Sequence, residues 1–444
     1  MNRQAATAKG LQRRIRDLGL HRVEDPRQRS KVRLSLQTVL TTLVTAMVTQ
    51  ARSLRSVEQR SAQIAAKHGN WMGLRARIAD NTFGKIVPRV PLAALTACLH
   101  RLVKAEHRRG NLAPTRLPHG TIAIDGKHVG TLRWHELCRL LGLNAAEATG
   151  DQVRALMTQR YPLAQLCVPA DGQPYALLRS HSVTLISSDA AVCIHQRPIA
   201  ADSNEIGSMP ALVAQLHAVY GRSALFRMVT TDAGNTSCAA AGCIIDAGWD
   251  YFAQIKSGHG ALYDEARRVL SRRSAARAQA TCADKQNGLL VTYHLWRTDL
   301  GGDGWLDWRH ARQLVRIRRT TENLHTGDVT VGNRFYVTSR PPAALSPTTA
   351  LQLSRAHWRC EDETHWTLDT QLHEDQRRLA WSRHPDGLLV VSLLRSIALA
   401  VLAVARRLSR FGHTRETPSW AQVAEHFLLQ LCGSILQTHV FDHV

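Results

Sequence analysis

The stretch ALFRMVTTDAGNTS, residues 224–237, combines two local signals. Its apolar and β-branched first half predicts a strand that runs into Asp232. Gly234 and the polar residues after it predict a turn and a helix cap. A helix over about 236–246 and a further strand, YFAQIK at 251–256, would complete a strand, helix, strand unit. The chain around Asp232 therefore indicates an α/β fold.

A strand that ends on an aspartate also occurs earlier in the chain. TIAID at 121–125 is a short apolar strand ending on Asp125, and we expect the glycine and lysine that follow to form a turn. Strand-like segments follow at 175–187 and 191–196, and a helix is expected over 204–221. Three leading strands followed by alternating helices and strands predict a mixed sheet flanked by helices.

The length of 444 residues exceeds what one hydrophobic core usually supports. The segments 32–67 and 91–108 have helical patterns, the stretch 257–331 is rich in arginine and partly β, and a long helix is expected from about 347. We therefore expect an all-helical N-terminal domain over 1–115, with a possible role in DNA binding. An α/β domain would follow in two parts, 116–256 and 332–444, the second of which carries the C-terminal helices. The basic and partly β segment 257–331 would be inserted between them.

The charge of the chain favours a polyanionic partner. Lysine and arginine number 57 against 35 acidic residues, which gives a formal net charge of +22. A surplus of this size predicts binding to DNA or RNA. The nine cysteines lack a paired CxxC framework and the N-terminus lacks an apolar signal segment, so we expect a cytoplasmic protein. The apolar run at 388–407 contains Arg395, which favours a buried helix over a membrane span, and no membrane partner is expected.

Against this basic background, HWRCEDETHWTLD at 357–369 gathers acids and histidines without glycine or proline. At 100° per residue, a helix would place His357, Glu361 and His365 on one face, which we expect to face the core. Glu361 could then join Asp125 and Asp232 at one edge of the sheet. Three carboxylates with open positions suit Mg²⁺ or Mn²⁺. Such a site could hold the two ions of phosphoryl transfer.

Each of these residues also has an ordinary interpretation. A DG turn after Asp125 could be plain hairpin chemistry, and Asp232 could belong to a helix-capping loop. A second kind of site would use His357, Glu361 and His365 as zinc ligands, although it would leave both aspartates unexplained.

Four motifs in order resemble the DDE transposases of bacterial insertion sequences, in particular the H-repeat-associated, ISAs-type group. They are AIDGKHVG (123–130), DSNEIGSMPAL (202–212), VTTDAGNTS (229–237) and HWRCEDETHWTLDTQLHEDQRR (357–378). The resemblance runs from about residue 24 to about 408. Asp362 stands where the family has asparagine and Cys360 where it has an aliphatic residue, and the long stretch 131–172 has no assigned role.

The resemblance implies that Asp125, Asp232 and Glu361 form the metal-binding triad of a ribonuclease H-like fold, interrupted by the basic insertion. It implies two Mg²⁺ (or Mn²⁺) ions, double-stranded DNA at terminal inverted repeats and at the target, and a dimer or larger assembly. The expected activity is cleavage at the element ends followed by strand transfer, in a bacterial, nucleoid-associated setting. A nuclease of the same fold without strand transfer and an inactive DNA-binding relic remain alternatives.

Candidate DNA contacts are basic residues near the three acids, in the insertion and after the Glu361 helix, together with the two histidines. They are Lys127, Arg267, Arg268, Arg272, Arg273, Arg277, His357, His365, Arg377 and Arg378.

Overall fold

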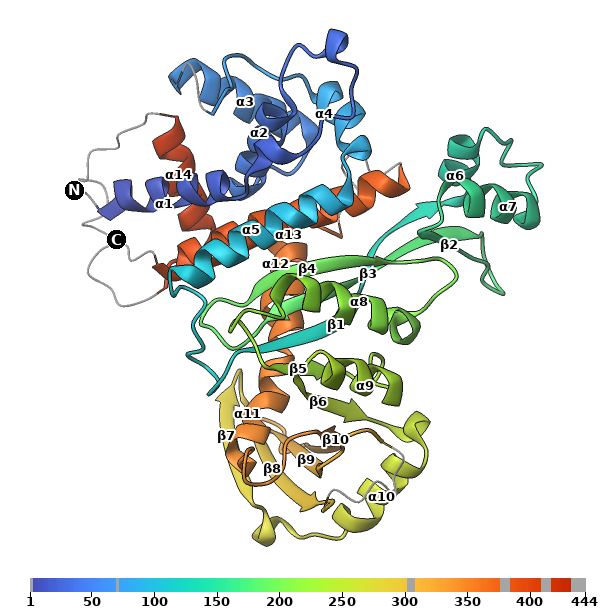
Figure 1. Cartoon of the computed structure of the whole chain (residues 1–444), viewed down its shortest axis with the longest axis vertical. Coiled ribbons are helices and arrows are strands. Elements are labelled where there is room, and N and C mark those ends of the chain that lie inside the picture. The colour runs from blue at the N-terminus through green and yellow to red at the C-terminus, as the bar shows by residue number, and fades with distance from the viewer. Residues whose placement is uncertain (1–2, 69–71, 302–307, 376–383, 409–416, 433–444) are drawn as a thin grey trace.

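The computed structural model describes residues 3–68, 72–301, 308–375, 384–408 and 417–432. Helices gather on one side of the molecule and a long mixed sheet extends from beneath them (Figure 1). Buried apolar residues of both parts, such as Leu40 and Ile124, belong to one continuous cluster. The helices and the sheet therefore share a core.

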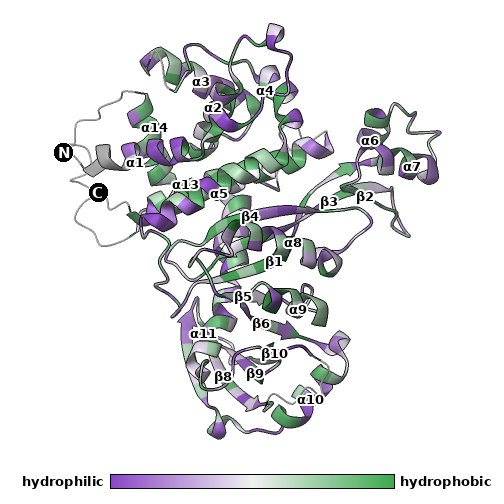
Figure 2. Ribbon diagram, in the orientation of Figure 1, coloured by the Kyte–Doolittle hydropathy of each residue, from purple (hydrophilic) through white to green (hydrophobic). Residues whose placement is uncertain are grey.

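The helical body consists of helices from both ends of the chain. They are α1 (Arg3–Asp17), α2 (Leu36–Val48), α3 (Leu54–His68), α4 (Asp80–Ile86), α5 (Leu92–Arg108), α13 (Pro385–Leu408) and α14 (Trp420–Leu431). Figure 2 shows hydrophobic residues along the helices packed around α13. The sequence divides these helices between two predicted domains, whereas the structure packs α13 against α1, α2 and α5.

Among the described residues, α13 is the one single helix long and apolar enough to cross a membrane. Its most apolar window is 94% buried inside the protein. Arg395, near its middle, is 8% exposed and donates a hydrogen bond to the carbonyl oxygen of Glu374. The prediction of a buried helix over 388–407 is therefore confirmed.

Five strands form the part of the sheet below the helical body. They are β1 (Thr121–Arg133), β3 (Tyr175–Leu185), β4 (Val192–Ile199), β5 (Met228–Thr231) and β6 (Asp250–Ile255). Their spatial order is β4-β3-β1-β5-β6, with β3 antiparallel to both β1 and β4 and with β5 parallel to both β1 and β6. Helices α8 (Glu205–Tyr220) and α9 (Cys238–Asp246) connect β4, β5 and β6. The predicted mixed sheet of three strands followed by alternating helices and strands is confirmed.

The turn predicted after Asp125 is wrong. β1 continues through Gly126 and Lys127 to Arg133, because β3 supplies a partner along this whole length, from the Ile122–Leu185 pair to the Arg133–Tyr175 pair. Backbone hydrogen bonds to a neighbouring strand override a local turn signal of two residues.

The basic segment after residue 257 extends the same sheet. It contains α10 (Ala261–Leu270), β7 (Ala280–Gln286), β8 (Leu289–Asp299) and β9 (Gln313–Asn323), and β10 (Val329–Thr338) follows. β10 pairs with β6, and β9, β8 and β7 follow it in an antiparallel series that completes a ten-stranded sheet. The expected β character of the insertion is confirmed.

Residues 131–172 belong to an arm that projects from the far ends of β1 and β3 (Figure 1). It contains α6 (Trp134–Leu141), α7 (Gly150–Arg160) and β2 (Ala164–Cys167). Leu137, Val153 and Met157 belong to a separate small core, which also includes Leu389 of α13.

The long helix expected from about residue 347 is divided in three. α11 (Pro347–His357) begins at Ser346, whose side chain accepts a hydrogen bond from the Thr349 amide. A π-helical segment (Cys360–His365) and α12 (Trp366–Gln371) follow. α11 contacts β5, β7 and β8, the π segment contacts β1 and β3, and α12 contacts α13. The π segment, which carries Glu361, is thus placed next to Asp125's strand.

Candidate active site

The parallel pairing of β1 and β5 brings two aspartates together. Ile124 lies opposite Thr231, so that Asp125 and Asp232 are the next residues on adjacent strands. Such strands are about 4.8 Å apart. Asp125 is only 8% exposed, whereas Asp232 lies half-buried beyond the end of β5.

The loop after β5 orients the side chain of Asp232. Its carboxylate accepts hydrogen bonds from the amides of Gly234 (3.1 Å) and Asn235 (2.9 Å) and from Asn235 Nδ2 (2.7 Å). Ser237, not Asp232, caps α9 by accepting from the Ala240 amide. Asp232 therefore organises its own loop, and the helix-capping function belongs to Ser237.

Glu361 comes to the same neighbourhood from the π segment. Burial raises the pKa of Asp125 to about 7, and the negative charges of Asp232 and Glu361 add to this effect. Partial burial, then the charges of Asp362 and Asp232, raise the pKa of Glu361, while the Arg334 guanidinium opposes the shift. Three segments far apart in the sequence therefore place carboxylates within electrostatic reach of one another.

The expectation that Glu361 faces the core between two histidines is wrong. Cys360 and Thr364 are buried, and Glu361 is exposed. A π segment contains more residues per turn than an α-helix, so the face that follows His357 rotates. Glu361 is consequently open to solvent.

The two histidines have different environments. His357 is 5% exposed and its Nδ1 lies 2.9 Å from Thr230 Oγ1, and burial lowers its pKa to about 4. A contact between His357 and DNA stays a prediction, and it would require this buried side chain to become accessible. His365 Nδ1 lies 3.5 Å from Asp125 Oδ2, and burial lowers its pKa to about 4 as well. A neutral His365 can exchange a hydrogen bond with a protonated Asp125 but does not neutralise an ionised one.

The residues present fit Mg²⁺ or Mn²⁺ better than zinc. Asp125, Asp232 and Glu361 offer only oxygen donors, which hard divalent cations prefer. Their mutual repulsion would be relieved by a cation between them. Within the described ranges, no three His, Cys, Asp or Glu side chains already share one coordinating geometry. His357 is directed to Thr230, which leaves the zinc interpretation without support.

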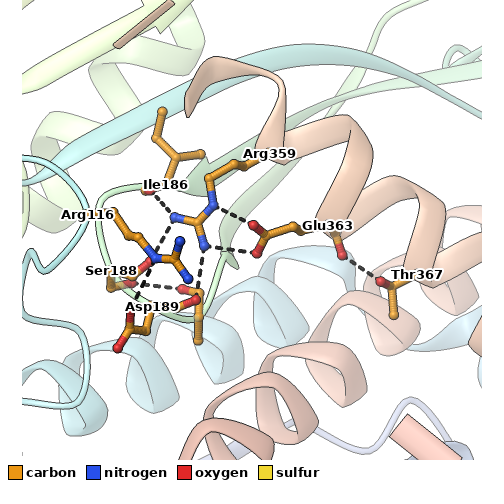
Figure 3. Close-up of polar contacts among 8 residues, drawn as sticks. Arg116, Ile186, Ser188, Asp189, Arg359, Glu363 and Thr367 are labelled. Atoms are coloured by element: carbon orange, nitrogen blue, oxygen red, sulfur yellow. Dashed lines mark hydrogen bonds and ion pairs between the residues drawn. The ribbon is translucent and has the colours of Figure 1, made fainter. Parts of the chain in front are cut away.

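Arg359 and Glu363, which the sequence did not single out, hold the π segment against the sheet on either side of Glu361. Arg359 donates to the carbonyl oxygens of Ile186, Ser188 (2.8 Å) and Asp189 (3.0 Å), at the end of β3 (Figure 3). It also pairs with Glu363 at 2.6 Å. The Arg-to-Glu spacing of four residues was the sequence signal for this pair. This ion pair engages Glu363, whereas the charge of Glu361 acts on Asp125.

Lys127 takes part in a buried ion pair with Glu374. It lies two residues beyond Asp125 on β1, and its side chain is 9% exposed. The pair connects the strand of Asp125 to the segment between α12 and α13. A contact between Lys127 and DNA stays a prediction, and it would require this pair to open.

Other expected DNA contacts lie on α10 and just after it. Arg267 and Arg268 are exposed, and Arg268 pairs with Glu265 at 2.6 Å. Arg272 and Arg277 are exposed, whereas Arg273 donates to the carbonyl oxygen of Arg297. These contacts stay predictions. Arg377 and Arg378 lie outside the described residues.

No family model matches the chain. Over 233 residues it is 25% identical to an Escherichia coli O157:H7 protein named "Putative transposase YncI", a match that covers 50% of this chain and 56% of that protein. The chain thus spans little more than half the length of this relative. A cryo-EM structure of a piggyBac transposase synaptic complex with hairpin DNA shares 11% identity and a TM-score of 0.43, over 92% of this chain and 74% of that chain. The chain is thus similar in sequence to a protein named as a putative transposase.

Proposed function

We propose that this chain is a DDE-type transposase with a ribonuclease H-like core, which binds the ends of an insertion sequence and catalyses DNA cleavage and strand transfer. The strand order β4-β3-β1-β5-β6, with three antiparallel strands followed by two parallel ones, supports this core. Similarity to a transposase in sequence agrees with it.

The observation that carries the proposal is the gathering of Asp125, Asp232 and Glu361. A buried acid beside two further acids costs free energy in the folded state, and proteins retain such an arrangement mainly at functional sites. In this chain burial, reinforced by the charges of Asp232 and Glu361, raises the pKa of Asp125 to about 7. Hence we assign the three carboxylates to a cation-binding site.

The three carboxylates would hold two Mg²⁺ or Mn²⁺ ions, which lower the pKa of the attacking water or 3′-hydroxyl and stabilise the leaving oxygen. Asp232 is held in position by its loop, and Asp125 by the β1 ladder. Glu361 is exposed and can meet the scissile phosphate. No covalent intermediate with the protein is required, because positioning and charge stabilisation account for phosphoryl transfer.

The excess positive charge would bind DNA. The net charge of +22 and the exposed arginines Arg267, Arg268 and Arg272 suit contacts with phosphates. Joining two element ends calls for a dimer or larger assembly on the DNA, in the bacterial cytoplasm at the nucleoid.

A cleavage assay tests the proposal. Purified chain, Mg²⁺ and labelled DNA bearing the inverted repeats that flank its gene should yield a nick at the element end. Asp125→Ala, Asp232→Ala and Glu361→Ala should each abolish the nick but retain binding in a gel-shift assay. Joining of the freed 3′-end to a target plasmid should accompany cutting.

Three results would overturn parts of this assignment. Full activity of Glu361→Ala with loss in Asp362→Ala or Glu363→Ala would move the third acid. Cutting without joining would identify a nuclease of the same fold. DNA binding without cutting by the unaltered chain, in Mg²⁺ and in Mn²⁺, would identify an inactive relic.

A further inference from the structure

α8 starts beside the part of β1 that carries Asp125. Asn204 caps this helix by accepting a hydrogen bond from the Gly207 amide at 2.7 Å. Glu205 is the first residue of the helix and is half-buried. An acid in the first turn interacts favourably with the helix dipole, which is an ordinary structural reason for its presence. The helix dipole does not explain why the carboxylate of Glu205 points toward Gly126 on β1.

The carboxylate of Glu205 occupies the space where a side chain at position 126 would lie. A Cβ added to Gly126 would be 1.9 Å from Glu205 Oε1 and 2.3 Å from its Cδ. Gly126 has no positive φ and pairs with His181 in the β1–β3 ladder, so its backbone conformation does not require glycine. The missing side chain instead admits Glu205 to the residue next to Asp125.

The same carboxylate also approaches Asp232. A Cβ added to Gly234 would lie 3.1 Å from Asp232 Oδ2 and 3.4 Å from Glu205 Oε2. The two oxygens thus flank one glycine and can be no farther apart than the sum of these distances. The Glu205 carboxylate therefore lies close to the loop that carries Asp232, while Gly126 is the glycine whose missing side chain makes room for it.

Glu205 and Glu361 approach Asp125 from different directions. Successive residues of a strand point to opposite faces of a sheet, so Asp125 and Gly126 face opposite sides of β1. Cys360, next to Glu361, lies on the side of Asp125, with its Sγ 4.0 Å from Asp125 Oδ2. Glu205 lies on the side of Gly126.

We propose that Glu205 is a fourth carboxylate of the metal-binding site, on the α8 side next to Asp232, where it holds a divalent cation directly or through a bound water. This inference rests on the proposed function, since it extends the same site. It also explains why glycine occupies position 126.

Cation binding by the full chain without DNA tests the role of Glu205 independently of activity. Mn²⁺ titrations by calorimetry should show at least about tenfold weaker binding for Glu205→Gln, which is the lower end of the loss when a supporting group of a metal site is removed. The matched control is Glu147→Gln. Glu147 is exposed on the arm, and the change removes the same charge while keeping the oxygen that accepts from Asn144. Its Mn²⁺ affinity should change less than twofold.

Gly126→Ala provides a second test that leaves every carboxylate in place. The new Cβ should displace the flexible end of Glu205 at little cost in stability, yet weaken Mn²⁺ binding about as much as Glu205→Gln. In a Glu205→Ala chain there is no carboxylate left for the new Cβ at position 126 to displace. Adding Gly126→Ala to that chain should therefore weaken Mn²⁺ binding no further. Circular dichroism and thermal unfolding verify that each variant is folded.

The outcomes separate this inference from the proposed function. If the unaltered chain binds Mn²⁺ and Asp125→Asn weakens binding, but Glu205→Gln and Gly126→Ala leave it unchanged, Glu205 is not part of the site and the proposed function stands. If the unaltered chain binds no Mn²⁺ at millimolar concentration, the proposed function and this inference fail together.

Discussion

Replacing Asp125 with asparagine should stabilise the metal-free protein at alkaline pH while removing its response to Mg²⁺. Burial, reinforced by two neighbouring acids, raises the pKa of Asp125 from the ordinary 3.8 to about 7. Since the folded state holds this proton more tightly than the unfolded chain, its contribution to stability is complete below pH 4 and is lost as the pH rises through about 7. Asparagine keeps the size of the side chain and removes the charge.

The size of the effect follows from the difference between the two pKa values. One pH unit corresponds to about 1.4 kcal/mol, so full ionisation of Asp125 costs the metal-free folded state at most about 4 kcal/mol. At about 2 °C per kcal/mol in a large domain, Asp125→Asn should raise the melting temperature by up to about 8 °C at pH 8.5. At pH 4.5 the carboxyl of Asp125 is protonated in the fold and the two proteins should melt within about 1–2 °C of each other.

Differential scanning fluorimetry with EDTA or with 10 mM Mg²⁺ would measure this behaviour. Mg²⁺ should stabilise the unaltered chain at pH 8.5, where the carboxylates are ionised, and should have little effect on Asp125→Asn. A melting temperature of Asp125→Asn at or below that of the unaltered chain at pH 8.5, with a full response to Mg²⁺, would refute the electrostatic account of this site.

Further expected outcomes concern the groups that surround the site and the DNA. Glu374→Ala should lower the free energy of unfolding by about 3–5 kcal/mol in urea titrations, because it leaves the buried ammonium of Lys127 without its ion-pair partner. Replacing both residues by methionine should recover most of this loss. Equal losses in the single and the double variant would contradict this. Arg359→Ala should lower the free energy of unfolding by about 1.5–3 kcal/mol, because it removes charged hydrogen bonds to three carbonyl groups, and it should slow Mg²⁺-dependent cutting. An unchanged free energy of unfolding would show that these hydrogen bonds do not stabilise the fold. Arg267→Ala with Arg268→Ala should weaken DNA binding and reduce the slope of log K against log salt by about 1.8, the value for two phosphate contacts; an unchanged slope would remove α10 from the DNA-binding surface.

Much of the fold followed from local pattern. Apolar runs ending on Asp125 and Asp232, with a helical segment after the second, predict the alternation of strands and helices, and the structure has that order. The long apolar helix with Arg395 was predicted as buried because a charge is costly in lipid, and the structure buries it. These features depend on side chains a few residues apart, which the sequence displays directly.

Features decided by distant neighbours did not follow from local pattern. The turn predicted at Gly126 is absent because β3 pairs along all of β1, and the packing of α13 against the N-terminal helices depends on residues almost the whole chain apart. The rotation of Glu361 toward solvent depends on a π segment whose register is set by contacts with β1 and β3. Sequence alone thus named the three acids, whereas only the tertiary structure brought Glu205 to Gly126, because burial and long-range pairing, not local propensity, determine which side chains meet.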